Sequence, residues 1–211
     1  MEKKYQYILM ADIISSRKSD QKMLMEHFAR LVSTSNSRNK PALASPLTIT
    51  LGDEFQSIAK NLKSALQVII SIEELIIQEQ YGFKLRYVLL EGEIDTPINE
   101  QIAYGMLGEG LTRARKALTE AKGNKARFSV DVKNKKLTNA LNNSLVIYQS
   151  LIDGWKIAKD YALITEFLMF GDYKKVANET GKTRSQIWKR EKSLKINEYI
   201  AIKEVIHYLI L

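Results

Sequence analysis

The chain has 211 residues, a formal net charge of +8 and 45% hydrophobic residues, which suits a globular protein with one large or two small domains. It contains no cysteine and only two histidines. Disulfides, a cysteine nucleophile and zinc fingers are therefore excluded, and a histidine-rich metal site is disfavoured. The positive charge favours an anionic partner. The polar start and the absence of any apolar run near ~20 residues predict a cytoplasmic protein without a signal peptide, a membrane span or a membrane partner.

The first half of the chain alternates strand-like and helix-like patterns. The predicted elements are, in order, a strand at 7–11, a helix at 20–35 opened by Asp20, a hairpin at 47–51 and 55–59, a helix at 61–80 capped by Asn61, a strand at 85–91, a helix at 110–121 and a strand at 127–132. The first six match the βαββαβ order of the ferredoxin-like fold. This order predicts an α+β fold whose antiparallel sheet is covered by helices on one face.

The second half of the chain is helical in pattern and contains no predicted strand. The polar segment 133–136 is the natural junction, which divides the chain into an α+β domain at 1–134 and an all-α domain at 135–211. The second domain is predicted to contain a helix or helix pair at about 137–155 and further helices at 157–170, 173–179, 183–194 and 198–211.

Two acidic residues occupy the ends of predicted strands. Asp12 ends the first strand and Asp53 lies at the tip of the hairpin, which neighbours that strand in a split βαβ sheet. Two converging carboxylates can hold Mg²⁺ against nucleotide phosphates. Ser15, Ser16 and Arg17 follow Asp12 into a turn that can expose N–H groups to a phosphate. The alternative is that both aspartates only stabilise turns.

The motifs around these aspartates resemble a known family. Segment 11–17 (Ala-Asp-Ile-Ile-Ser-Ser-Arg) and segment 51–55 (Leu-Gly-Asp-Glu-Phe) are similar to the metal-binding strand end and hairpin of class III nucleotidyl cyclases and diguanylate cyclases. Nearly the whole chain resembles the SatD family, through Gln56 after the hairpin, the Ala114-Arg115 pair, Trp155 and a C-terminal helix-turn-helix. The resemblance implies a nucleotidyl-cyclase-like palm domain over 1–134.

The resemblance also implies roles for individual residues. Asp12 and Asp53 would be ligands of Mg²⁺ or Mn²⁺, with the backbone carbonyl of Ile13 as a third ligand. Arg115 would stabilise charge on the transferring phosphate, which makes it the candidate catalytic residue. The chain departs from the cyclase pattern at Leu111, where an asparagine is usual, and no lysine–aspartate pair for reading a purine base is identified.

A second motif lies near the C-terminus, at about 173–195. Ala177, Gly181 and Ile187 have the spacing of a helix-turn-helix, in which a small residue sits at the helix crossing, a glycine in the turn and an apolar anchor in the second helix. Thr183 is a suitable N-cap for that second helix. A solvated helical hairpin with the same spacing is the alternative.

The outer face of the second helix is polar and basic, as a DNA-reading helix requires. The predicted DNA-binding residues are Thr183, Arg184, Ser185, Gln186, Lys189, Arg190 and Lys192.

These two motifs support rival functions. The favoured one is a DNA-binding regulator whose palm domain senses a metal-bound nucleotide, because the helix-turn-helix pattern is complete whereas the cyclase site lacks parts. The alternative is an active nucleotidyl cyclase or nucleotidyltransferase using Asp12 and Asp53. A ferredoxin-like RNA-binding protein is a weaker third, since strand 85–91 lacks the aromatic pair that stacks bases. A homodimer on duplex DNA is expected, because helix-turn-helix proteins read paired half-sites.

Overall fold

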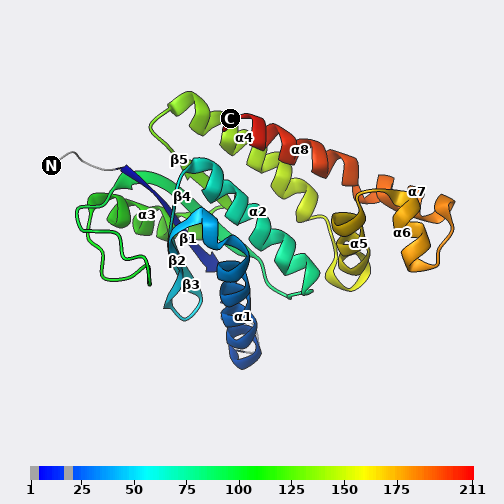
Figure 1. Ribbon diagram of the computed structural model, residues 1–211, viewed down its shortest axis with the longest axis horizontal. Helices are drawn as coiled ribbons and strands as arrows, with labels where there is room; N and C mark the ends of the chain where they lie inside the picture. Colours follow the sequence, from blue (N-terminus) through cyan, green and yellow to red (C-terminus); the bar gives the residue numbers. More distant parts are fainter. Residues whose placement is uncertain (1–4, 17–20) are drawn as a thin grey trace.

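The computed structural model describes residues 5–16 and 21–211, and its centre is a five-stranded sheet of order β2-β3-β1-β4-β5 (Figure 1). The strands are β1 (Tyr5–Ile13), β2 (Leu43–Leu51), β3 (Glu54–Ala59), β4 (Leu85–Glu93) and β5 (Phe128–Asp131). The first four strands are antiparallel in the ferredoxin-like order, as predicted, whereas β5 pairs with β4 in parallel. The sheet is therefore mixed, because a helical crossover returns the chain to the same end of the sheet before β5.

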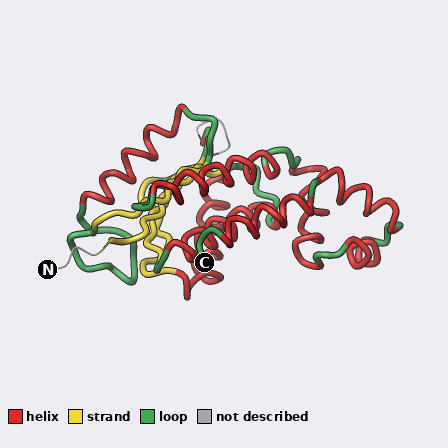
Figure 2. Tube along the Cα trace, turned by 90° about the horizontal axis from the view of Figure 1, so that it is seen from above, coloured by secondary structure: helices red, strands yellow, loops and turns green. Residues whose placement is uncertain are grey.

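Helices cover both faces of this sheet, so the prediction of a single covered face is wrong (Figure 2). The helices are α1 (Gln21–Asn39), α2 (Leu62–Gln78), α3 (Glu109–Glu120), α4 (Lys135–Ile152), α5 (Ala162–Phe170), α6 (Tyr173–Thr180), α7 (Arg184–Leu194) and α8 (Ile196–Tyr208), with short 3-10 turns η2 (Lys40–Ala42) and η3 (Ala121–Gly123) and a π-helix η4 (Ile157–Tyr161). Helices α1 and α2 pack on the face of Leu9 and Ala11, and α3 packs on the face of Ile8 and Met10. The reason is that β1 is apolar at successive positions, which requires cover on both sides.

Two glycines allow α3 to approach β4 closely. A Cβ atom added at Gly92 of β4 would lie 2.6 Å from the Cα atom of Gly110 in α3, and one added at Gly110 would lie 2.7 Å from the Glu93 carbonyl oxygen. The helix and strand backbones are therefore in direct contact, which no residue with a side chain would permit at either position.

Several predicted local features are present. The Asn61 side chain accepts a hydrogen bond of 2.8 Å from the Ser64 N–H and so caps α2. The chain reverses between β2 and β3 through Gly52 and Asp53. Two predicted residues, Arg17 of the phosphate loop and Asp20 of the helix cap, lie outside the described residues.

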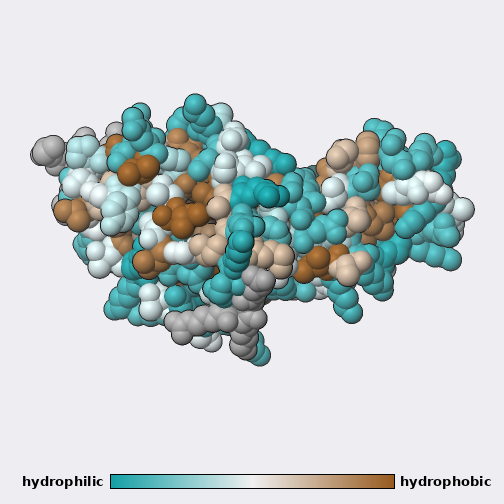
Figure 3. Space-filling view, turned by 90° about the horizontal axis from the view of Figure 1, so that it is seen from below, coloured by the Kyte–Doolittle hydropathy of each residue, from teal (hydrophilic) through white to brown (hydrophobic). Residues whose placement is uncertain are grey.

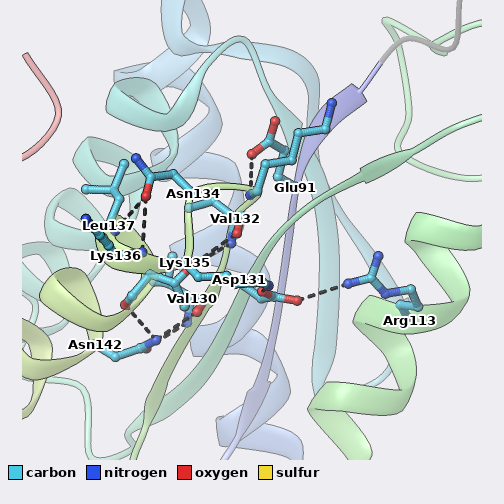
Figure 4. Close-up of polar contacts among 12 residues, drawn as sticks. Glu91, Arg113, Val130, Asp131, Val132, Asn134, Lys135, Lys136, Leu137 and Asn142 are labelled. Carbon is cyan, nitrogen blue, oxygen red and sulfur yellow. Dashed lines mark hydrogen bonds and ion pairs between the residues drawn. The ribbon is translucent and has the colours of Figure 1, made fainter.

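The segment around the predicted junction is held by side-chain hydrogen bonds between β5 and α4 (Figure 4). Asn142 of α4 accepts from the Val130 N–H at 2.9 Å and donates to the Val130 carbonyl at 2.8 Å, as a neighbouring strand would. Asn134 caps α4, and Asp131 pairs with Arg113 at 3.0 Å. These contacts fix the start of α4 against the edge of the sheet.

The C-terminal helices continue the apolar core of the sheet. Helix α4 lies beside β5 and α8, and α5 to α7 form the far end of the molecule (Figure 1). A series of aromatic contacts connects β5 to the C-terminal helices. The ring centroids of Phe128 and Tyr148, and those of Tyr148 and Tyr199, are 5.7 Å apart, and those of Tyr199 and Trp155 are 5.0 Å apart. No helix in the described part of the chain has the length and apolar character needed to cross a bilayer.

The surface of the molecule is mixed in character. In the space-filling view, hydrophilic side chains cover most of the visible face, and the hydrophobic ones are scattered among them in small groups (Figure 3). Exposed apolar residues occur on several elements, including Leu107 before α3, Val146 on α4 and Trp188 on α7. Single exposed apolar residues are normal on a protein surface.

Candidate functional site

A row of charged side chains crosses three neighbouring strands on the face that α3 covers. Asp12 near the end of β1 is in register with Glu54 of β3 on one side and Arg86 of β4 on the other. Side chains alternate along a strand, so Asp12 shares its face with the buried residues Ile8 and Met10. The strand register therefore places two acids and a guanidinium side by side at one end of the sheet.

Two further cations reach this row from the segment above it. Lys122 of η3 places its Nζ atom 3.3 Å from Glu54 Oε1 and 3.6 Å from Asp12 Oδ2. Arg115 of α3 forms an ion pair with Glu54 through Nη1 and Oε2. Arg86 Nη1 donates to Asp12 Oδ1 at 3.2 Å and to Oδ2 at 3.1 Å. We call these five residues the charged row.

Asp53 lies beside the charged row, in the hairpin turn. Its Oδ2 atom accepts a hydrogen bond of 2.6 Å from the Ser16 hydroxyl, and its backbone carbonyl accepts one of 2.9 Å from the Ile13 N–H. The turn after β1 and the tip of the hairpin are thus tied together. Ser15 is exposed between them with a positive φ of 58°, a conformation that costs a serine energy and often marks a functional turn.

The Asp12 carboxylate lies in an environment that opposes its ionisation. The side chain is buried, and burial raises the pKa of Asp12 above its ordinary value. Arg86 and Lys122 offset this rise, whereas Glu54 and Asp53 add to it. Because burial opposes ionisation, a further cation beside Asp12 would stabilise the ionised carboxylate and lower its pKa.

We tested whether these residues suit a divalent metal. Among the described residues no three acidic, histidine or cysteine side chains form a metal cluster. Mg²⁺ in nucleotide sites commonly uses one or two protein carboxylates and completes its shell with phosphate and water. The Asp12 oxygens have only long contacts, at 3.1 to 3.6 Å, and keep acceptor capacity. Asp12 and Asp53 are the two carboxylates at this end of β1 whose oxygens could belong to such a partial ligand set.

Sequence reasoning identified Asp12, Asp53, Ser16 and Arg115 as members of one site, and all four lie in or beside the charged row. It missed Arg86, Glu54 and Lys122. Arg86 could have been found as the arginine at the start of a strand whose next four residues, 87–90, are apolar, since buried charges are seldom placed without a partner. Lys122 lies beyond the end of α3, so the helical periodicity of α3 does not predict where its side chain points.

Leu111 occupies the position where the resemblance leads one to expect an asparagine. Its side chain is buried in the apolar cluster between α3 and the sheet. It therefore contributes packing and no hydrogen bond to the site.

A large cavity lies elsewhere in the described structure. It measures about 1290 Å³ and is bordered by Gln6, Lys60 and Ile94, at the opposite end of β1 from Asp12. None of the charged-row residues lines it. The candidate site is therefore not located by this cavity. Its charged residues lie at the other end of β1, near Asp12.

Near the C-terminus, α6 and α7 are joined by a turn in which Gly181 has a φ of 64°. The residues predicted to pack these helices together, Val176, Ala177 and Ile187, are buried. The cap of α7 is a capping box, in which Thr183 accepts from the Gln186 N–H and Gln186 accepts from the Thr183 N–H.

Most of the predicted DNA-binding residues are exposed. These are Thr183, Arg184, Ser185, Gln186, Lys189 and Lys192. Arg190 is half-buried instead, and its guanidinium pairs with Asp160 of η4 at 2.5 Å. Trp188 lies on the exposed side of α7 with 47% of its surface accessible.

The mixed sheet and its two layers of helices form an α+β fold similar to that of nucleotide-cyclase palm domains. Solved structures with this likeness include a bacterial light-regulated adenylyl cyclase (12% identity, TM-score 0.47, 60% of this chain and 74% of that chain). A second is the adenylyl cyclase CyaB from P. aeruginosa, with 11% identity and a TM-score of 0.42 over 57% of this chain and 74% of that chain. A third is a guanylyl cyclase domain from the aquatic fungus Blastocladiella emersonii, with 15% identity and a TM-score of 0.42 over 56% of this chain and 75% of that chain.

A family model covers almost the whole chain. The model of the SatD family matches residues 7–210, and the chain belongs to the SatD family. Among curated proteins, none matches the sequence.

Proposed function

We propose that this protein binds a nucleoside triphosphate at the charged row and transfers its nucleotidyl group, in the manner of a nucleotide cyclase. One observation carries the proposal. Three acids and three cations, from four separated segments of the chain, converge at the ends of β1 and β3. A purely structural cluster would gain more from apolar packing than from so many partly buried charges.

Asp12 and Asp53 would hold Mg²⁺ or Mn²⁺, with the carbonyl oxygen of Ile13 as a further ligand. Such an ion, when bound, polarises the α-phosphate and lowers the pKa of an attacking hydroxyl. The turn at Ser15 and Ser16 lies next to both aspartates through the Ser16–Asp53 hydrogen bond. Its exposed backbone is suited to a phosphate oxygen.

The three cations match the charge that moves in nucleotidyl transfer. A ribose hydroxyl oxygen forms a bond to the α-phosphorus, the bond from that phosphorus to the bridging oxygen breaks, and pyrophosphate leaves with the electron pair. The hydroxyl proton passes to water. Arg115 and Lys122, now paired with Glu54, would turn to the phosphates and stabilise the charge on the leaving group.

Chromatography of the products from ATP and GTP tests the transfer. With Mg²⁺ or Mn²⁺ present, we expect pyrophosphate and one nucleotide product in equal amounts, and neither from an Asp12→Asn variant. Nucleotide binding without any product would reduce the function to that of a sensor, whereas an absence of binding would reject the site.

A second candidate function is binding of duplex DNA through α7. The observation in its favour is that Arg184, Lys189 and Lys192 are exposed on a helix that follows a tight turn. Cations of this kind contact phosphates and fix a helix in the major groove. Nucleotide binding at the charged row would then regulate a DNA-binding protein.

We also propose a homodimer. The loop 94–108 between β4 and α3 exposes Ile102 by 48%, Tyr104 by 65% and Leu107 by 69%. The same loop is fixed to the sheet by a hydrogen bond of 2.8 Å from the Ala103 N–H to the Thr48 hydroxyl. Apolar side chains on an anchored loop are suited to a partner surface.

A further inference from the structure

A cavity of about 330 Å³ lies where the end of α4, the π-helix η4 and the junction of α7 and α8 meet. In Figure 1 this is the region between the long α4–α8 pair and the α5–α7 end of the molecule. Its lining includes Trp155, Lys156, Lys159, Asp160, Arg190 and Lys195. No residue of the charged row lines it, so it is a separate feature from the proposed nucleotide site. We call it the cationic cavity.

The lining carries an excess of positive charge. It contains the four cations Lys156, Lys159, Arg190 and Lys195 and the single acid Asp160, which leaves a formal charge of +3 (four minus one). Among the described residues, no carboxylate lies within ion-pair distance of the Lys156, Lys159 or Lys195 ammonium groups. Three lysines therefore line the concave surface without an ion pair of their own, and the one acid of the lining, Asp160, is paired with Arg190.

The one acid is fully engaged. Asp160 accepts from the Lys156 N–H at 2.9 Å through Oδ2 and from Arg190 at 2.5 Å through Oδ1. Burial opposes ionisation, but the Lys156 N–H and Arg190 together hold the pKa of Asp160 below its ordinary value. Asp160 thus positions Arg190 at the cavity wall and forms no ion pair with the lysines.

The backbone at the wall adopts costly conformations. Lys195, between α7 and α8, has φ 56° and ψ 42°, a left-handed position that glycine normally occupies after a helix. The π-helix η4 is likewise rare, and such turns are frequent at functional sites. Glycine would adopt this backbone with less strain than lysine, so the Lys195 side chain can be removed without a cost in backbone conformation.

We propose that the cationic cavity binds the phosphate or pyrophosphate group of a small phosphorylated molecule. The volume is near the lower limit of ligand pockets, which run from about 300 Å³, so it admits a compact group and no polymer backbone. The three lysine ammonium groups and Arg190 supply the charge-assisted hydrogen bonds that phosphate oxygens accept. The site borders α7 through Arg190, so a bound anion would alter the support of that helix.

Tryptophan fluorescence gives a direct test. The chain has two tryptophans, and a Trp188→Phe variant leaves Trp155 as the sole reporter. Trp155 is buried beside the cavity, with its Nε1–H donated to the Leu194 carbonyl at 2.9 Å. Titration of this otherwise complete chain with pyrophosphate should change the Trp155 emission with saturation, whereas sodium chloride at equal ionic strength should not.

Two variants and a matched control decide the assignment. Lys195→Gly should raise the pyrophosphate Kd by about tenfold, the loss of one charge-assisted hydrogen bond, while leaving the melting temperature equal or higher, because glycine relaxes the left-handed backbone. Arg190→Met should weaken binding at least as much. A Lys174→Met/Lys175→Met double variant removes exposed charge from α6, outside the cavity, and should bind within about twofold of the parent.

The outcomes separate this site from the nucleotide site. Asp12→Asn should leave the Trp155 titration unchanged even if it abolishes nucleotide binding at the charged row. A non-saturating titration, a Lys195→Gly variant with the parent's Kd, or an equal loss in the α6 control would each overturn the cationic cavity as a phosphate site.

Discussion

Glu73 of α2 and Arg127, just before β5, form an ion pair of 2.9 Å with both side chains almost completely buried. Arg127 also donates to the Leu85 carbonyl at 2.7 Å and pairs with Asp153, beyond the end of α4, at 3.1 Å. The Tyr87 hydroxyl donates to the same Glu73 carboxylate at 2.8 Å. This buried pair therefore joins the sheet, α2 and the end of α4 at one point.

Replacing Arg127 with methionine should destabilise the fold by about 3–5 kcal/mol, because Glu73 would remain as a buried charge without a partner. Urea unfolding followed by circular dichroism measures the change. The Arg127→Met/Glu73→Leu double variant should recover much of the loss, since it removes both charges. Equal instability of the single and double variants would show that packing, and not charge, dominates.

The lowered pKa of Asp153 should make the free energy of unfolding depend on pH. Burial opposes its ionisation, but Arg127 and Lys84 together lower its pKa below the ordinary value of 3.8. A lowered carboxyl pKa contributes stability that is present above the unfolded value and lost as the pH falls through the folded value. Asp153→Asn should be less stable than wild type at pH 7, and the difference should shrink below about pH 4. A constant difference across acid unfolding curves would contradict this role.

Nucleotide binding should raise the melting temperature through linkage to folding. ATP or GTP at about 100 times its Kd, with Mg²⁺, would add about 2.7 kcal/mol of stability. Asp12→Asn should abolish the increase, whereas Asp131→Asn, which alters an exposed carboxylate at the other end of the sheet, should keep it. Differential scanning fluorimetry distinguishes the two, and an unchanged increase in Asp12→Asn would remove Asp12 from the site.

Binding of DNA by α7 should depend on salt and on two exposed cations. Arg184→Ala/Lys189→Ala should weaken duplex binding and reduce the slope of log K against log salt by about 0.9 for each phosphate that is no longer neutralised. Fluorescence anisotropy with a labelled duplex at low salt measures both. Lys116→Ala, which removes an exposed charge from α3, is the control. If the wild type does not bind duplex DNA at low salt, the DNA function is rejected.

Dimerisation should depend on the exposed loop between β4 and α3. Tyr104→Ser/Leu107→Ser should shift a dimer toward monomer in light scattering after gel filtration, because it removes exposed apolar area from the proposed interface. Val146→Ser, which replaces an exposed apolar residue of α4, should leave the assembly unchanged. A wild-type monomer at high concentration would contradict the proposal.

Local sequence patterns were sufficient to predict most helices and strands, but not which faces of the sheet the helices cover. The Asn61 cap, the Gly52–Asp53 turn and the order of strands follow from residue types along short segments. The prediction of one covered face followed the alternation in β2 and did not use the runs of successive apolar residues at 8–11 in β1 and 87–90 in β4, which are consistent with a strand buried on both faces.

The same limit applies to the candidate site. Asp12 and Asp53 were visible because they end strands, whereas the pairing of Asp12 with Arg86 depends on a register between strands that are distant in the sequence. The pairing of Arg190 with Asp160 likewise requires α7 to lie against η4. Spacing within α7 placed Arg190 among the outward-facing residues, but it carries no information about a neighbouring helix.

The close contact of Gly92 with Gly110 has a consequence for the distant end of α3. This helix carries Arg115 and leads directly to Lys122, so its height above β4 sets how far both cations stand from Glu54 and Asp12. A single methyl group at Gly110 would meet the Glu93 carbonyl and tilt or lift the helix. The two glycines thus set the shortest possible distance between α3 and β4. The electrostatics of the charged row therefore depend on two residues that have no charge and no side chain.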